Sequence, residues 1–276
     1  MNGFHLSDTH FIRPDASERL GAVPIADDGT RLRRVLRAAM NYAQKPDFFL
    51  ITGDLVHEGD AEDYRAYRAL LDECCGDVPY YVCLGNHDRH RAFHEGFLGE
   101  SGDAPYVRSS VQEGLRIISL DSSPEDATIM GRITPEQLAF LREELKTPAP
   151  KGTVVLLHHP PRGVVYESFA AHCPEMEELA ELLESGEVRA VFSGHTHFVS
   201  CSGRNGVLYS TAASTAFSME MRRADRGMVF SDRSTFNLVR VGEDGVFAGT
   251  EDMDEKAVLL RISAEEMAKV INQEIA

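Results

Sequence analysis

Residues 48–54 read Phe-Phe-Leu-Ile-Thr-Gly-Asp, an apolar run that ends in a glycine and a carboxylate. Such a run, short and bounded by glycine, is typical of a strand buried on both faces of a sheet. Similar runs followed by polar residues occur at 80–88, 115–121, 153–159 and 188–197. Because helical patterns separate many of these runs, the chain predicts an α/β fold built from βαβ units.

Amphipathic helices are predicted where apolar residues recur at helical spacing. Thr30 is expected to be the N-cap of the first helix, and Thr134 is expected to form a capping box with Gln137 at the third. The helices are expected at 30–40, 60–76, 134 onward, 174–186 and 263 onward.

No internal repeat, low-complexity tract or linker interrupts the 276 residues, so one domain over 1–276 is predicted. The polar motifs lie within 8–197. After Gly206 the pattern changes to short strands and turns, including a hairpin signal around Gly242-Glu243-Asp244-Gly245. Residues 206–276 are expected to complete the second sheet and to add a C-terminal helix.

The charge of the chain limits its partners. Asp and Glu total 44 against 28 Lys and Arg, which gives a formal net charge of -16. Such a surface repels the phosphates of nucleic acids and of anionic membranes, so neither a nucleic-acid polymer nor a membrane is expected as a partner. The chain also carries 11 histidines. Imidazole and carboxylate together are the ligands of hard-to-borderline metals, so a metal protein is favoured.

The cysteines indicate a reducing compartment. They number five, include the adjacent pair Cys74 and Cys75, and form no CxxC spacing, so neither a disulfide framework nor a thiolate zinc site is predicted. The first residues lack the basic and apolar regions of a signal peptide, and no run of about 18 apolar residues occurs. We therefore expect a cytoplasmic protein.

Polar residues follow five of the predicted strands at the point where each strand ends. Loops beyond the carboxyl ends of neighbouring strands share one crevice in an open α/β sheet, so these segments can converge. Residues i and i+2 of an extended segment point the same way, and the glycines before the ligands are expected to turn the backbone sharply. The five segments are Asp8-Thr9-His10, Gly53-Asp54, Gly85-Asn86-His87-Asp88, His158-His159-Pro160-Pro161 and Gly194-His195-Thr196-His197.

Seven of these side chains are too many for one four-coordinate ion and suit two ions that share a bridging carboxylate. Imidazole, carboxylate and amide ligands without thiolate favour Fe, Mn, Zn, Co or Ni. The seven candidate ligands are Asp8, His10, Asp54, Asn86, His158, His195 and His197. The sequence thus predicts a binuclear centre and leaves its metals open.

The ordered set DTH, GD, GNHD, HHPP and GHTH resembles the calcineurin-like metallophosphoesterase superfamily. Within it, the chain is most similar to the class III cyclic-nucleotide phosphodiesterase and glycerophosphodiesterase group. The resemblance covers residues 8–197 and implies a metallophosphoesterase-type α/β/β/α sandwich, in which two mixed sheets are flanked by helices.

The resemblance also implies a role for each motif residue. Asp54 would bridge the two metals, and His87 would face the substrate and could protonate the leaving group. The first metal would bind the DTH residues and the last histidine of GHTH, namely Asp8, His10 and His197. The second metal would take one residue from each of three motifs, namely Asn86, His158 and His195.

The function implied is hydrolysis of a small phosphodiester, a cyclic nucleotide or a glycerophosphodiester, by a hydroxide that bridges the metals. Two divalent ions bring about +4, and Asp8, Asp54 and the hydroxide return about −3, which leaves a weakly positive focus for an anionic substrate. A phosphomonoesterase of the same fold is the alternative, followed by a non-catalytic binding scaffold. The surface charge disfavours a nuclease.

Several further residues are candidates for the pocket, with a solvated loop residue as the alternative for each. The expected substrate-binding residues are Arg89, His159 and His57. His90, Arg162 and Tyr166 are likewise expected either to line the pocket or to be solvated loop residues. Asp88 is expected either to orient His87 or to cap a turn, and Asp121 has the same ambiguity.

Other residues are assigned to structure. His5, His94 and His172 are expected to be structural, and Cys201, Met219 and Met221 to serve packing or a subunit contact. The segment Ser210–Thr215 resembles one that lies near the site or at an oligomer contact in this group. A homodimer is therefore considered.

Overall fold

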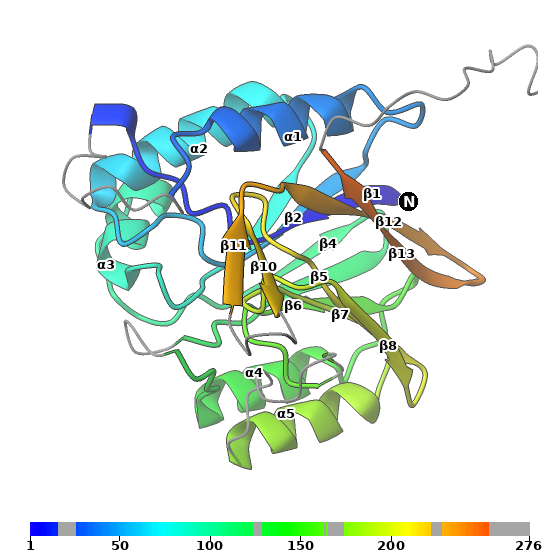
Figure 1. Ribbon diagram of the computed structural model, residues 1–276. Helices are drawn as coiled ribbons and strands as arrows, with labels where there is room; N and C mark the ends of the chain where they lie inside the picture. The colour runs from blue at the N-terminus through cyan, green and yellow to red at the C-terminus, as the bar shows by residue number, and fades with distance from the viewer. Residues whose placement is uncertain (16–25, 124–128, 163, 165–173, 222–227, 254–276) are drawn as a thin grey trace, which may run out of the picture.

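The computed structural model describes residues 1–15, 26–123, 129–162, 164, 174–221 and 228–253. Two mixed sheets lie one above the other, with helices on the outer face of each (Figure 1). The α/β/β/α sandwich expected from the sequence is therefore confirmed.

The first sheet has the strand order β13-β12-β1-β2-β3. Strands β1, β2 and β3 are parallel, whereas β12 runs antiparallel to both β1 and β13. The strands are β1 (Asn2–Leu6), β2 (Phe48–Thr52), β3 (Tyr80–Cys83), β12 (Thr235–Gly242) and β13 (Gly245–Asp252). Helices α1 (Thr30–Met40) and α2 (Ala61–Cys75) cover its outer face, and α3 (His90–Phe93) continues into the π-helical turn η2 (His94–Leu98) (Figure 1).

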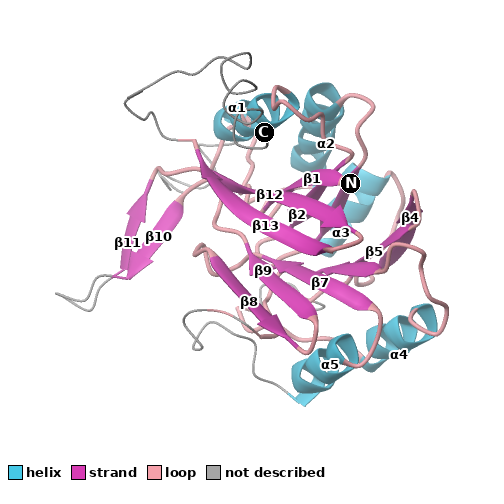
Figure 2. Cartoon of the chain, turned by 90° about the vertical axis from the view of Figure 1, so that its right-hand side faces the viewer, coloured by secondary structure: helices cyan, strands magenta, loops and turns pink. Residues whose placement is uncertain are grey.

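The second sheet has the order β4-β5-β6-β7-β9-β8 and is parallel except at its two edge strands. Its strands are β4 (Arg108–Gln112), β5 (Leu115–Ser119), β6 (Thr153–Leu156), β7 (Val188–Ser193), β8 (Ser200–Arg204) and β9 (Val207–Thr211). Helices α4 (Pro135–Glu144) and α5 (Pro174–Glu184) cover it. A separate hairpin, β10 (Ser218–Met221) and β11 (Met228–Ser231), projects beside the sandwich (Figure 2).

Strand β2 shows why the apolar run at 48–52 decides the fold. All five residues are buried. Phe48 and Leu50 join the core between the two sheets, and Phe49 and Ile51 join the core under α1 and α2. Because alternate residues of a strand face opposite sides, a strand covered on both faces must be apolar throughout.

Two helix starts differ from expectation. Gly29, in a left-handed conformation, is the N-cap of α1, and the Asp27 carboxylate accepts from the Leu32 N–H at 3.0 Å. Thr134 does cap α4, but the Gln137 side chain bonds the Asp121 backbone instead of completing a capping box. In both cases a residue other than the expected one makes the contact.

The last third of the described chain contributes to both sheets rather than to one. Strand β9 extends the second sheet, whereas the predicted hairpin forms β12 and β13 and extends the first sheet from β1. The helix expected from Ser263 lies outside the described residues. Among the helices of the described ranges, none combines the length and the apolar character that a membrane crossing needs.

Candidate functional site

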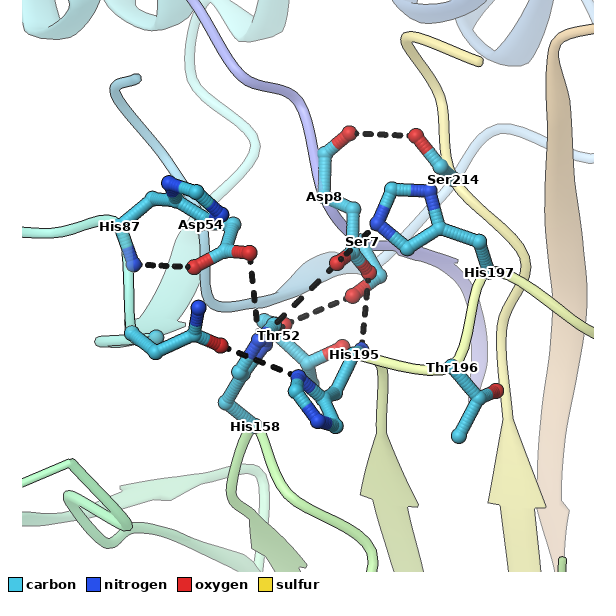
Figure 3. A network of polar contacts seen from close by, with 12 residues as sticks. Ser7, Asp8, Thr52, Asp54, His87, His158, His195, Thr196, His197 and Ser214 are labelled. Carbon is cyan, nitrogen blue, oxygen red and sulfur yellow. Dashed lines mark hydrogen bonds and ion pairs between the residues drawn. The ribbon is translucent and has the colours of Figure 1, made fainter. Parts of the chain in front are cut away.

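The loops after β1, β2, β3, β6 and β7 meet at one edge of the sandwich, and their polar side chains point toward one another (Figure 3). His197 Nε2 lies 3.1 Å from Asp8 Oδ1, and His158 Nε2 lies 3.3 Å from Asp54 Oδ2. All seven ligand residues expected from the sequence are therefore brought to this edge.

The candidate ligand atoms form two groups with Asp54 between them, and His10 also belongs to a third group with His57 and His87. Those of Asp8, His10, Asp54 and His197 all lie within 4.8 Å of one another, and so do those of a second group, His158, His159 and His195. His195 Nδ1 also lies 3.0 Å from Asn86 Oδ1. Asp54 Oδ2 is 3.7 Å from His10 Nε2 as well as close to His158, so its carboxylate reaches both groups.

The hydrogen bonds of the histidines suit a cation. His158 Nδ1 lies 2.9 Å from the Thr52 carbonyl oxygen, which can only accept, so Nδ1 carries the proton and, in the neutral ring, Nε2 offers a lone pair. That Nε2 and Asp8 Oδ1 are buried, and neither makes a hydrogen bond of good geometry to the charged partner 3.1–3.3 Å away. Electron-rich atoms that face one another in a buried site need a positive charge between them, so the donor set fits divalent metal ions.

The acid–base properties reflect the same crowding of charge. Burial lowers the pKa of His158, but the Asp54 and Asp8 carboxylates outweigh it and raise this pKa to about 10. Burial raises the pKa of Asp8, but His197 and His158 lower it to about 2. In the protein without cations, a proton on His158 therefore takes the place of a positive ion.

Five of the seven candidate ligands have left-handed backbone conformations, which are uncommon for residues other than glycine. Their φ values lie between 41° and 67°. Such conformations cost free energy and persist where the surrounding contacts enforce them, and they cluster at functional sites. The five are Asp8, His10, Asp54, His195 and His197.

The glycines of the motifs act in two different ways. Gly53 has φ +76°, so it makes the sharp turn expected before Asp54. Gly194 has no such φ. A Cβ there would lie 1.7 Å from Ser7 Oγ and 2.5 Å from Asp8 Oδ2. This glycine is therefore needed for the close approach of the β7 and β1 loops, not for a turn.

His87, the expected substrate-facing residue, lies at the solvent side of the site, with 31% of its side chain exposed. Its backbone N–H donates to Asp54 Oδ1 at 2.8 Å. Glu58 lies beside it, with Oε1 3.5 Å from His87 Nδ1 and Oε2 3.6 Å from an Arg89 nitrogen. Glu58 was not among the residues expected from the sequence, although it lies only four residues after Asp54.

The other two expected substrate-binding residues are more deeply placed. His57 Nδ1 lies 3.0 Å from His10 Nδ1, and its ring stacks on His87 at 4.8 Å. His159 lies 3.0 Å from Ser122 Oγ through Nδ1, and its ring centre is 4.3 Å from that of His195. His57 therefore lies against the candidate ligand His10, and His159 against the candidate ligand His195.

Two further candidates from the sequence, Arg162 and Asp88, have partners other than the expected ones. Arg162 forms ion pairs with Glu177 and Glu184 on α5. Asp88 does not orient the His87 side chain: it accepts from Tyr64 and from three backbone N–H groups, and so holds the turn.

Asp121 pairs with His90 at 2.7 Å. His5 is buried and lies 2.8 Å from the Thr52 hydroxyl, and His94 lies 3.0 Å from a backbone carbonyl, which suits structural roles. Cys201 is an exposed free thiol on β8, and Met219 and Met221 lie in β10. Tyr166 and His172 lie outside the described residues.

The segment Ser210–Thr215 adjoins the site. Ser214 Oγ donates to the Asp8 carbonyl oxygen at 2.7 Å (Figure 3). Thr215 N donates to the Ser7 carbonyl oxygen at 2.9 Å. Phe217, which the sequence analysis missed, packs its ring against those of His10 and His197. These residues hold the left-handed Asp8 loop in place.

Comparisons with known proteins agree with this geometry. Residues 1–199 match the family described as calcineurin-like phosphoesterase. A probable cyclic nucleotide phosphodiesterase of Rhodococcus erythropolis is 34% identical over 247 residues, 88% of this chain and 80% of that protein. A cAMP/cGMP dual specificity phosphodiesterase of Mycobacterium tuberculosis is also 34% identical, over 88% of this chain and 76% of its own length.

Two further proteins are similar over parts of the chain or in fold. A probable glycerophosphodiester phosphodiesterase of Arcobacter nitrofigilis is 33% identical over 63% of this chain and 65% of that protein. The crystal structure of a dimetal phosphatase from Danio rerio superposes with a TM-score of 0.61 over 92% of this chain and 98% of that one. At 14% identity, that likeness shows the shared fold alone.

Proposed function

Because this chain belongs to the calcineurin-like phosphoesterase family, we propose that it is a two-metal hydrolase of small phosphodiesters such as cyclic nucleotides. The observation that carries the proposal is the position of Asp54, whose carboxylate reaches His10 on one side and His158 on the other. A carboxylate between two groups of ligands is the arrangement that a pair of ions requires.

We assign the ligands by group. One ion would be held by the enclosed group, and Asp54 would contact both ions. The enclosed group is Asp8, His10, Asp54 and His197. The second ion would be held by His158 and His195 of the second group together with Asp54 and Asn86, which lie beside them. The donor set suits Fe, Mn, Zn or Co, and the choice among them is left to metal analysis.

Bound cations would supply a nucleophilic hydroxide near neutral pH and would neutralise the phosphate charge. The protein contributes the remaining parts. His87 faces the solvent side, where a substrate enters, and can hold a proton for the leaving alkoxide. Glu58 lies beside it, with Oε1 3.5 Å from His87 Nδ1. We also propose that Arg89, His57 and His159 contact the substrate.

The decisive test compares bis(p-nitrophenyl) phosphate with p-nitrophenyl phosphate, each with added Mn²⁺. We expect the higher kcat/KM for the diester. A clear preference for the monoester would support the phosphomonoesterase alternative. Absence of tight metal sites in a calorimetric titration would instead support a non-catalytic scaffold.

The cellular setting is part of the proposal. Four cysteines among the described residues are free thiols, Cys74, Cys75, Cys83 and Cys201, which supports a reducing, cytoplasmic location. The net charge of -16 disfavours nucleic-acid polymers as substrates. A homodimer is proposed as the assembly, to be tested by sedimentation.

A further inference from the structure

Phe217 forms an apolar wall behind two of the candidate metal ligands. Its ring centre lies 4.2 Å from that of His197 and 5.3 Å from that of His10, and only 5% of the residue is exposed. His197 Nδ1 also lies 3.2 Å from its carbonyl oxygen. The ring therefore belongs to the inner surface of the site.

A second ring continues this wall to the surface. Phe230 on β11 lies with its ring centre 5.7 Å from that of Phe217, at an interplanar angle of 42°, and 53% of the residue is exposed. Strand β11 pairs with β10 and with neither of the large sheets among the described strands, and the pair projects from the body of the molecule (Figure 2). An exposed aromatic face thus stands one ring away from the candidate ligands.

Two other described aromatic residues are comparably exposed, but they lie elsewhere and have other partners. Tyr42 packs against Phe4 at 5.4 Å, on the first sheet. Phe247 on β13 carries the Arg240 guanidinium 4.1 Å above its ring. Among the described residues, neither of these rings contacts a ring that packs on a candidate ligand histidine. Of these three exposed rings, only Phe230 contacts the Phe217 ring that packs on His197.

We propose that Phe230 is a stacking platform for the base of a nucleotide whose phosphate occupies the candidate metal centre. This inference rests on the proposed function and narrows its substrate class to nucleotides over glycerophosphodiesters. A nucleotide combines a flat aromatic base with an anionic phosphate, which matches an exposed phenyl face beside a candidate cation site. A glycerophosphodiester offers no ring to such a face.

The chemistry of a phenyl ring also defines the specificity expected. Base–aromatic stacking tolerates any base, because every base presents a π-face. Phenylalanine adds no hydrogen-bond donor or acceptor that could distinguish adenine from guanine. Phe230 is therefore expected to favour nucleotides as a class and not one base over another.

A binding experiment tests the platform without relying on hydrolysis. The chain contains no tryptophan, so the Phe230→Trp variant carries a single indole at the proposed contact. We expect AMP to quench its fluorescence saturably in the metal-loaded protein, and ribose 5-phosphate, which lacks only the base, to leave it unchanged. The matched control is Phe247→Trp, whose emission should respond to neither compound.

A kinetic experiment tests the same contact in substrate turnover. In Phe230→Ala, the KM for 3′,5′-cyclic AMP should rise about five- to tenfold, the lower range for loss of one stacked base, with kcat within about twofold. The kcat/KM for glycerophosphoethanolamine should stay within about twofold of the wild type. Phe230→Tyr, which keeps the ring face, should restore the KM.

Three results would overturn the platform. These are equal quenching by AMP and ribose 5-phosphate, parallel losses on both diesters, or an indole emission that shifts with protein concentration and ignores AMP, as expected if a second copy covers Phe230. Quenching specific to AMP in a protein that hydrolyses no diester would support the platform and reject the proposed function, so the two failures are distinguishable.

Discussion

The two groups of candidate ligands differ in burial and in charge. In the group around Asp8, every side chain is buried, with exposures of 0% for Asp8, 1% for His10 and 6% for His197. In the group around His158, Asn86 and His195 are only partly buried. The first group contains two carboxylates, Asp8 and Asp54, whereas the second has only that of Asp54, which it shares with the first. Because affinity rises with ligand charge and enclosure, we expect the first group to bind its ion more tightly and the second to meet the substrate.

Replacing the shared carboxylate should have the largest effect. Asp54→Asn removes the charge that both groups use, so metal content should fall from two ions to less than one, and kcat should fall by about 10³-fold or more, consistent with several kcal/mol from the ions. Elemental analysis and diesterase assays measure both quantities. Asp77→Asn, at an exposed position after α2, is the control. Loss of one ion alone would show that Asp54 does not bridge.

Removing a ligand from the less buried group, around His158, should weaken one metal site without the other. Asn86→Ala should abolish the weaker metal site in a calorimetric titration and leave the tighter one, because Asn86 contacts His195 of the less buried group. We expect kcat to fall by about 10²-fold. A variant that keeps near-normal kcat would contradict the two-metal mechanism. Loss of the tighter site would show that the group around His158, not the group around Asp8, binds its ion more tightly.

The close approach beneath the enclosed group can be tested through stability. Gly194→Ala places a Cβ against Ser7 Oγ and Asp8 Oδ2, so the free energy of unfolding should fall by about 1–3 kcal/mol, the usual range for overpacking. In the matched control, Gly203→Ala on β8, no atom lies within 4 Å of the new Cβ. Urea unfolding should leave the control near wild type; equal stability of both variants would show that the two loops separate at little cost.

A smaller, pH-dependent effect is expected from His5, on β1 below the enclosed group. Burial lowers its pKa from 6.5 to about 3. Between these values the unfolded chain binds more protons, so stability present above pH 6.5 is lost as the pH falls, at up to about 1.4 kcal/mol per pH unit.

His5→Gln should flatten this decline between pH 6.5 and 4, as measured by urea unfolding in chelator. His94→Gln provides the control for loss of a hydrogen-bonded histidine. Parallel pH profiles of His5→Gln and the wild type would show that His5 does not cause the acid sensitivity.

Some features could be predicted because their causes are local. The burial of β2 follows from five consecutive apolar or β-branched residues, and the N-cap of α2 follows from the Asp60 carboxylate, which accepts from the Asp63 N–H. The start of α1 also has a local cause, the Asp27 carboxylate, but Thr30 is a competing cap residue in the same stretch of sequence. Arg162 illustrates a different limit, because its acidic partners lie on α5.

The sequence by itself determined the α/β class, the order of the five motifs and the ligand types at each strand end, because strand period and side-chain chemistry are properties of neighbouring residues. Only the tertiary structure decided that β12 pairs with β1, that Glu58 stands beside His87 and that Phe230 continues the wall behind His197. Such contacts join segments far apart in the chain, and their free energy depends on the packing of both partners, which no local pattern records.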